Sequence, residues 1–289
     1  MAIQHQIEAQ KTNLQPARKV FSSRLQHEWH CPSTYHQVRR LITEISQGKR
    51  PRSDLIVLDN EFSGATKQLW EFGIIEQVSG KTLVNTTIKH DNGLEHDGPA
   101  AARGSTFKST ASRVQASKIF FQSRMNIEHM DVHQVAAKLK DIGMRPKTLV
   151  LAWHLHAADL QILRNFLESA GYYGILPPDD HCFPMVAVLR PNLPKVGKKQ
   201  FPMRLDMLFP LMFPNHRLVG LNHEALINCQ QTRLICLAFK QLCRPVEERQ
   251  TQWQPVIDKK PLQASIQDWL IKRSPVKEAK VGSDPEASP

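Results

Sequence analysis

The alternation of apolar and polar positions predicts strands in the first half of the chain. Residues 54–62 (DLIVLDNEF) form a continuous apolar run that ends in carboxylates. This pattern is typical of a buried strand whose end reaches a site. Residues 69–77 and 81–89 predict two further strands, and Ser79-Gly80 indicates a hairpin turn between them. Three strands in succession indicate an antiparallel meander.

The second half alternates strand and helix patterns. Helical spacing extends over residues 131–142, 158–170 and about 224–242, and an apolar run at 147–153 predicts a short strand. Gly143 and Gly171 follow two of these helices, as C-terminal caps do. A meander followed by this alternation predicts an α/β domain with a mixed β-sheet flanked by helices.

Other segments have weaker patterns. The first 25 residues show no clear period, and we expect loose order there, before a helix at 36–45. Proline and glycine interrupt residues 174–201, which we expect to be mostly irregular. Residues 204–213 are apolar and ambiguous, and 217–221 fit either a short strand or a loop.

These patterns divide the chain into three parts. Residues 1–53 form a basic N-terminal extension with a helix, 54–245 form the main domain, and 246–289 form a C-terminal extension that is mostly tail. Within the main domain, residues 98–127 carry five basic residues and no acidic one. That segment is either a solvated flexible insertion or an arm that lies along phosphates.

Composition narrows the class of protein. The 289 residues have a net charge of +11 and are 41% apolar, which excludes wholesale disorder and collagen-like repetition. Five cysteines, three of them seven residues apart on one predicted helix, do not form a disulfide framework. The N-terminal residues are polar, and no apolar run is long enough to span a membrane. We therefore expect a reduced, intracellular protein of the nucleus or cytoplasm, with no membrane partner.

Candidate chemistry begins with Asp59 and Glu61, which are two residues apart on the first strand and therefore point to the same face. Two adjacent carboxylates repel one another unless a cation lies between them, and oxygen ligands favour Mg²⁺ or Mn²⁺. The alternative is a pair of solvated carboxylates beyond the strand end.

Two further residues have a structural and a functional interpretation. Asp159 opens a predicted helix, where its charge either complements the helix dipole or turns back over the sheet edge. His223 directly precedes the last long helix, where it is either a polar cap or a base.

Together these residues resemble the DEDD-type 3′–5′ exonucleases of the ribonuclease H-like superfamily, in the subgroup with a histidine base. The first motif is Asp59-Asn60-Glu61, followed by 69–75 (LWEFGII). The second is 154–160 (HLHAADL), with Leu155 where an Asn is common, and the third is 223–228 (HEALIN). The resemblance covers about residues 54–243.

The resemblance implies a ribonuclease H-like sheet and phosphodiester hydrolysis with two Mg²⁺ or Mn²⁺ ions. It also implies a role for each matched residue. Asp59 and Glu61 would hold metal, Asp159 would serve the second ion, and His223 would be the general base. The implied partner is DNA or RNA with single-stranded or frayed 3′ ends.

Asn228 departs from the family pattern, because the family's fourth metal-ligand Asp would stand there. An amide offers a neutral oxygen and removes one negative charge. Three hypotheses follow: weak activity, activity with Asp206 or Glu224 as a substitute carboxylate, or a nucleic-acid-binding or adaptor module that has lost turnover. A small-molecule phosphate enzyme is a further alternative, although the sequence has no Gly-rich phosphate loop.

Overall fold

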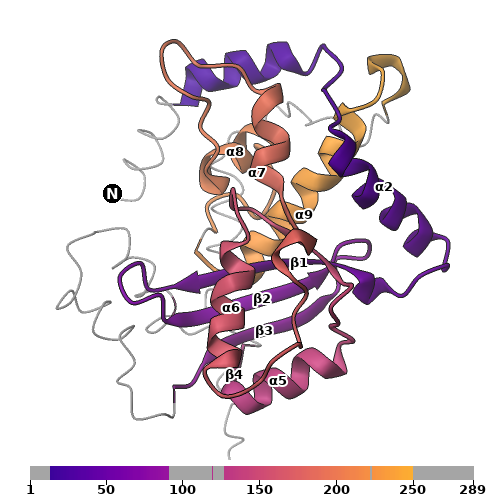
Figure 1. Ribbon diagram of the computed structural model, residues 1–289. Coiled ribbons are helices and arrows are strands. Elements are labelled where there is room, and N and C mark those ends of the chain that lie inside the picture. The colour runs from indigo at the N-terminus through magenta and orange to yellow at the C-terminus, as the bar shows by residue number, and fades with distance from the viewer. Residues whose placement is uncertain (1–13, 91–118, 120–126, 222, 250–289) are drawn as a thin grey trace, which may run out of the picture.

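The computed structural model describes residues 14–90, 119, 127–221 and 223–249. Its centre is a mixed six-stranded sheet in the order β4-β3-β2-β1-β5-β6 (Figure 1). The strands are β1 (Leu55–Phe62), β2 (Leu69–Glu76), β3 (Thr82–Ile88), β4 (Glu128–Met130), β5 (Leu149–Ala152) and β6 (Cys182–Pro184). The expected α/β class with a mixed sheet flanked by helices is confirmed.

The predicted meander is present, because β2 pairs antiparallel with both β1 and β3. On the other side of β1, β5 and β6 add in parallel, and β4 adds in parallel to β3. The parallel alignment of β1 with β5 brings the carboxyl ends of these two strands to the same edge of the sheet. Ligand sites of open α/β sheets form at such an edge.

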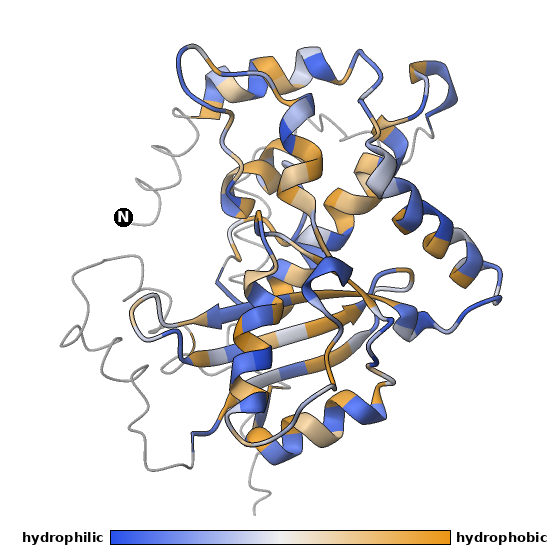
Figure 2. Ribbon diagram, in the orientation of Figure 1, coloured by the Kyte–Doolittle hydropathy of each residue, from blue (hydrophilic) through white to orange (hydrophobic). Residues whose placement is uncertain are grey.

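Helices cover both faces of the sheet. They are α2 (Ser33–Ser46), α5 (Val132–Asp141), α6 (Ala158–Glu168), α7 (Met185–Leu189), α8 (Leu205–Met212) and α9 (Ala225–Leu242). Helices α5 and α6 pack on one face, whereas α2, α7, α8 and α9 pack on the other. Figure 2 shows the apolar strands between these amphipathic helices.

The alternation of β1 side chains explains how one strand serves two cores. Leu55 and Val57 belong to the core under α9, whereas Ile56 and Leu58 belong to the core under α6. All four side chains are buried. Burial on both faces is why the sequence of β1 has a continuous apolar run and no alternating pattern.

The expectation of loose order over the first 25 residues was wrong for residues 14–24, and residues 1–13 lie outside the described residues. The short elements β4, β6 and α7 were not predicted. Residues 14–24 are helical, because Leu14, Ala17 and Phe21 are buried at helical spacing, with Phe21 packed edge-on against Trp29 at 6.1 Å. The segment expected to be irregular at 174–201 contains β6 and α7, which are too short for periodicity to reveal. The expected strands did not include β4, which is three residues long.

Other expectations have mixed outcomes. The ambiguous run at 204–213 is mostly helix α8, and 217–221 contains neither helix nor strand. The basic insertion at 98–127, except residues 119 and 127, and the tail from 250 onward lie outside the described residues. Among the described helices, none is both long and apolar enough to cross a membrane.

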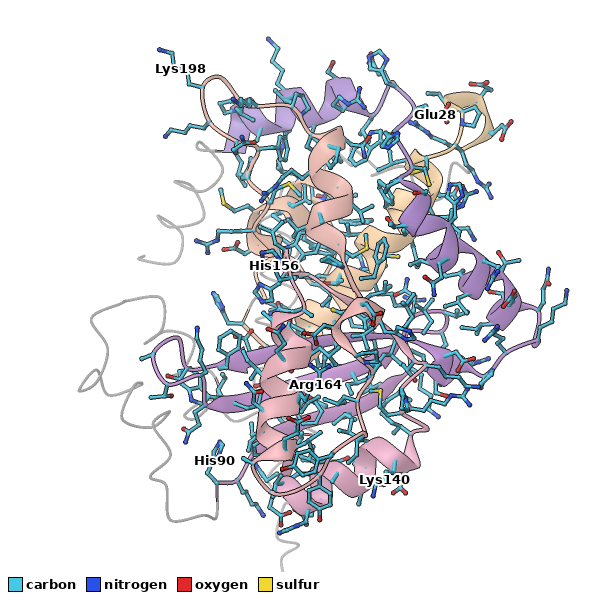
Figure 3. All side chains as sticks on the ribbon, viewed as in Figure 1. Glu28, His90, Lys140, His156, Arg164 and Lys198 are labelled. Carbon is cyan, nitrogen blue, oxygen red and sulfur yellow. The ribbon has the colours of Figure 1, made fainter. Side chains whose placement is uncertain are left out.

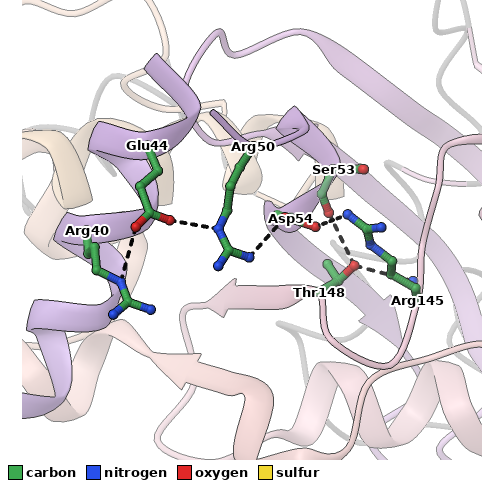
Figure 4. A network of polar contacts seen from close by, with 7 residues as sticks. All are labelled: Arg40, Glu44, Arg50, Ser53, Asp54, Arg145 and Thr148. Atoms are coloured by element: carbon green, nitrogen blue, oxygen red, sulfur yellow. Dashed lines mark hydrogen bonds and ion pairs between the residues drawn. The ribbon is translucent and has the colours of Figure 1, made fainter. Parts of the chain in front are cut away.

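An ion-pair network fixes the N-terminal part of the chain to the amino end of β1 (Figure 4). Arg50 Nε lies 2.7 Å from Glu44 of α2, and Arg50 also lies 3.5 Å from Asp54. Arg145, from the turn before β5, pairs with the other oxygen of buried Asp54. Glu44 and Asp54 therefore offset the positive charges of Arg50 and Arg145 at this end of the sheet.

Candidate active site

A cleft of about 740 Å³ opens at the carboxyl ends of β1 and β5. The end of β1, the segment after β5, the chain between α7 and α8, and the start of α9 all contribute to its wall. Four of the five residues predicted from the sequence line it, namely Asp59, Glu61, His223 and Asn228. The fifth, Asp159, is fully buried behind Asn60, which also lines the cleft.

Asp59 and Glu61 continue the β1 alternation that carries Leu55 and Val57, so they face α9. Both residues are 5% exposed. Asn228, from the first turns of α9, donates its side-chain amide to both of them. Its Nδ2 lies 3.1 Å from Asp59 Oδ2 and 2.9 Å from Glu61 Oε1. The amide thus supplies the partial positive charge between two carboxylates that would otherwise repel one another.

Asp159 approaches from α6, in the first turn of that helix. Its Oδ1 accepts a hydrogen bond of 3.2 Å from the backbone N–H of Asn60, and the Asn60 amide donates to the Asp159 carbonyl at 2.6 Å. Its Oδ2 is buried, accepts no hydrogen bond from a described residue, and lies 3.6 Å from His154 Nε2. One buried carboxylate oxygen therefore lacks full compensation.

Burial dominates the electrostatics of the site. It raises the pKa of Asp59 well above its usual range, and the charges of Asp159 and Glu61 raise it further, while the hydrogen bond from Asn228 lowers it. Burial also raises the pKa of Asp159 to about 6, against the lowering effects of His154 and of the Asn60 backbone N–H. The site therefore favours either protons or a cation near these oxygens.

His223 has a left-handed backbone, with φ of 67°. A non-glycine residue in this conformation costs about 1–2 kcal/mol, and such residues cluster at functional sites. The conformation precedes the N-cap of α9 and accompanies a half-buried side chain that lines the cleft. His223 therefore lies in the wall of the same cleft as Asp59 and Glu61.

Glu71 is a buried carboxylate of the site region that the sequence analysis did not select. It lies directly opposite Glu61 on β2, and its Oε1 accepts a 2.8 Å hydrogen bond from the backbone N–H of Ala225. The signal was present in the sequence, because Glu71 interrupts the apolar run of β2. Glu71 thereby fixes the start of α9.

Gly73 lets α9 approach the sheet closely. A Cβ atom at this position would lie 2.8 Å from the backbone nitrogen of Leu226. This close approach, together with the Glu71 contact, places Asn228 within hydrogen-bond distance of Asp59 and Glu61. The position of the Asn228 amide thus depends on the close packing of α9 against β2.

Of the two carboxylates considered as substitutes at the site, only one lines the cleft. Asp206 does so, but Arg204 binds both of its oxygens, at 3.0 and 2.6 Å. Glu224 is the N-cap residue of α9 and is not part of the cleft wall.

Asp59, Glu61 and Asp159 offer oxygen ligands of the kind that bind divalent cations, but these oxygens are not gathered around one position. In the described ranges, no group of three or more His, Cys, Asp or Glu side chains is gathered as a metal centre. The Asn228 amide lies between Asp59 and Glu61, and Asp159 Oδ1 accepts a hydrogen bond from the backbone N–H of Asn60. The carboxylate oxygens nevertheless suit hard cations, and Asp159 Oδ2 is a buried oxygen that accepts no hydrogen bond from a described residue. Searches of protein-family models, curated proteins and solved structures found no match to this chain.

Proposed function

We propose that the protein is a metal-dependent 3′–5′ exonuclease of the ribonuclease H-like superfamily. The observation that supports this proposal most strongly is the convergence of Asp59, Glu61 and Asp159 at one edge of the sheet, with negative charge that the described residues compensate only in part. The meander β1–β3 extended by parallel β5 and β6 is compatible with that fold.

Each residue has a role that follows from its location. Asp59, Glu61 and Asp159 would hold Mg²⁺ or Mn²⁺, and these ions, when bound, stabilise negative charge on the phosphate and lower the pKa of a water molecule. His223, at the cleft wall, takes the proton from the attacking water. Substrate is a polynucleotide with a single-stranded or frayed 3′ end, consistent with the excess of basic residues in the chain.

End-labelled oligonucleotides test the proposal. A 5′-labelled single-stranded DNA or RNA incubated with protein and Mn²⁺ is expected to give a ladder that shortens from the 3′ end. The Asp59→Asn variant is expected to give none. The proposal fails if the wild type releases no nucleotides with Mg²⁺ or Mn²⁺.

A second candidate function is nucleic-acid binding without catalysis, and the Asn228 contacts favour it. An amide that already bridges Asp59 and Glu61 lowers the need for a cation at that position. The Asn228→Asp variant separates the two candidates. A large gain in cleavage supports the binding module, since the wild-type residue then suppresses turnover. Robust wild-type cleavage that the substitution leaves unchanged supports the exonuclease.

A further inference from the structure

The chain between α7 and α8 carries a concentration of positive charge. Residues 190–204 contain five basic residues and no acidic one. They are Arg190, Lys195, Lys198, Lys199 and Arg204, and all five are exposed. Like charges held this close together repel one another, so a solvated loop gains no stability from the pattern.

Most of these charges have no ion-pair partner among the described residues. Arg190 and the three lysines form no ion pair with any residue in the part of the chain that the structure describes, whereas Arg204 pairs with Asp206. The arginines at the amino end of β1 have the opposite arrangement, since Asp54 and Glu44 neutralise them (Figure 4). The positive charge of residues 190–204 is therefore available to an anionic ligand.

The same segment is part of the cleft wall at both of its ends. Arg190 lines the cleft at the end of α7, and Phe201 and Arg204 line it before α8. Trp153 Nε1 donates a 3.0 Å hydrogen bond to the Met203 carbonyl, which ties the returning chain to the end of β5. A bound anion at this segment would lie beside the carboxylate site.

A tight turn between these ends presents the lysines. Val196 and Lys199 exchange two backbone hydrogen bonds, of 2.9 and 3.2 Å, and Gly197 has φ of 61°. Figure 3 shows Lys198 at the outer tip of the molecule, far from Lys140 on α5. Lys198 is three residues from Phe201, so their Cα atoms are at most about 11 Å apart. The lysines do not line the cleft themselves, but the turn that carries them is joined to the cleft wall by a short stretch of chain.

We propose that Arg190 and this lysine turn (Lys195, Lys198 and Lys199) bind the phosphates of a nucleic-acid strand whose 3′ end lies in the cleft. The inference rests on the proposed function for the direction of the strand, but binding to the turn requires no hydrolysis. Arg190 offsets the repulsion between the phosphates and the carboxylates near the strand end. The lysine turn contacts phosphates farther from that end, and its contacts do not depend on base sequence.

Fluorescence anisotropy with a labelled 20-nucleotide oligo(dT) or oligo(rU) tests the proposal, in EDTA so that no cleavage occurs. The test variant is Lys195→Gln/Lys198→Gln/Lys199→Gln. The matched control is Lys81→Gln/Lys140→Gln/Lys147→Gln, which removes three exposed lysines that lie outside residues 190–204. Thermal melting checks that both variants fold.

The wild-type affinity is expected to fall steeply with salt. In the test variant, the slope of log K against log[salt] is expected to decrease in size by about 2, because each single-strand phosphate contact contributes about 0.7. The control is expected to keep the wild-type slope. Equal losses in both variants, no loss in the test variant, or no wild-type binding would overturn the inference. Binding of the wild type to anionic phospholipid vesicles through the lysine turn, with no binding to oligonucleotides, would also overturn the inference.

The outcome separates this inference from the proposed function. If binding depends on the lysines but no nucleotide is released in Mn²⁺, the phosphate-binding turn is supported and the exonuclease proposal is rejected. Conversely, nucleotide release with equal wild-type and test-variant affinity for the 20-nucleotide strand retains the exonuclease and rejects the turn as its strand-binding surface.

Discussion

Asn228 donates its side-chain amide to Glu61 Oε1 at 2.9 Å, across 167 residues of sequence. The same amide nitrogen also donates to Asp59, so both of its hydrogens are used between two buried carboxylates. Asn228, which departs from the motif that the sequence resembles, therefore contacts both carboxylates of the site. Its amide stabilises the pair without metal, and a carboxylate there would instead increase the need for a cation.

Asn228→Asp is expected to destabilise the metal-free protein by about 2–4 kcal/mol, because two hydrogen bonds are lost and a third carboxylate joins the pair. It is expected to increase the rise in melting temperature that Mn²⁺ produces. Differential scanning calorimetry with EDTA and with Mn²⁺ measures both effects. Asn165→Asp, at an exposed position on α6, is the control and is expected to change neither. An Asn228→Asp protein as stable as wild type in EDTA would contradict this account.

Asp159 makes the metal-free protein sensitive to pH. Its folded-state pKa of about 6 lies above the ordinary value of 3.8. The folded state thus binds the proton more tightly, and the stabilisation is complete below about pH 4 and lost as the pH rises through about 6. The loss is on the order of 3 kcal/mol at most. Asp159→Asn is expected to flatten this part of the stability–pH curve, as measured by urea unfolding in EDTA. An unchanged curve would show that Asp159 is not the group responsible.

Substitutions of His223 are expected to affect the stability of the fold and the rate of cleavage differently. Because of its left-handed backbone, His223→Gly is expected to be more stable than His223→Ala by about 1 kcal/mol, although both lose the same imidazole. Both variants are expected to lose about 10²–10⁴-fold in cleavage rate and to retain Mn²⁺ binding. Unfolding curves and single-turnover cleavage test the two parts. Full activity in either variant would exclude His223 as the base.

Gly73→Ala is expected to destabilise the fold by about 1–3 kcal/mol, because the added methyl group meets the α9 backbone at Leu226. The displacement also weakens the contacts of Asn228 with Asp59 and Glu61. Urea unfolding measures the loss, with Gly64→Ala as the control because a Cβ atom at Gly64 has no neighbour within 4 Å. Equal stability of the two variants would mean that α9 is free to move away from β2.

The sequence predicted the parts of the fold that long apolar runs encode. Strands β1 to β3 and helix α9 have enough periodic positions to be recognised, and Asp59 and Glu61 interrupt such a run where the cleft lies. The short elements β6 and α7 are held by packing against neighbours distant in sequence. A run of three to five residues carries no usable period.

The geometry of the site was less predictable than its residue types. In the sequence, Asn228 is notable only because it has no charge at its motif position. Its structural role depends on Asp59 and Glu61 of β1, which are more than 160 positions away. Glu71 is the opposite case, since a carboxylate within an apolar strand was visible but was not interpreted. Only tertiary structure shows that it holds the N-terminus of α9.

A crystal structure of the wild-type protein soaked with Mn²⁺ and a nucleoside 5′-monophosphate tests the central claim most directly. The account predicts Mn²⁺ bound by Asp59, Glu61 and Asp159, with the Asn228 amide displaced from at least one carboxylate and the phosphate beside the metal. A site without Mn²⁺ at saturating concentration, with Asn228 still bonded to both Asp59 and Glu61, would contradict it.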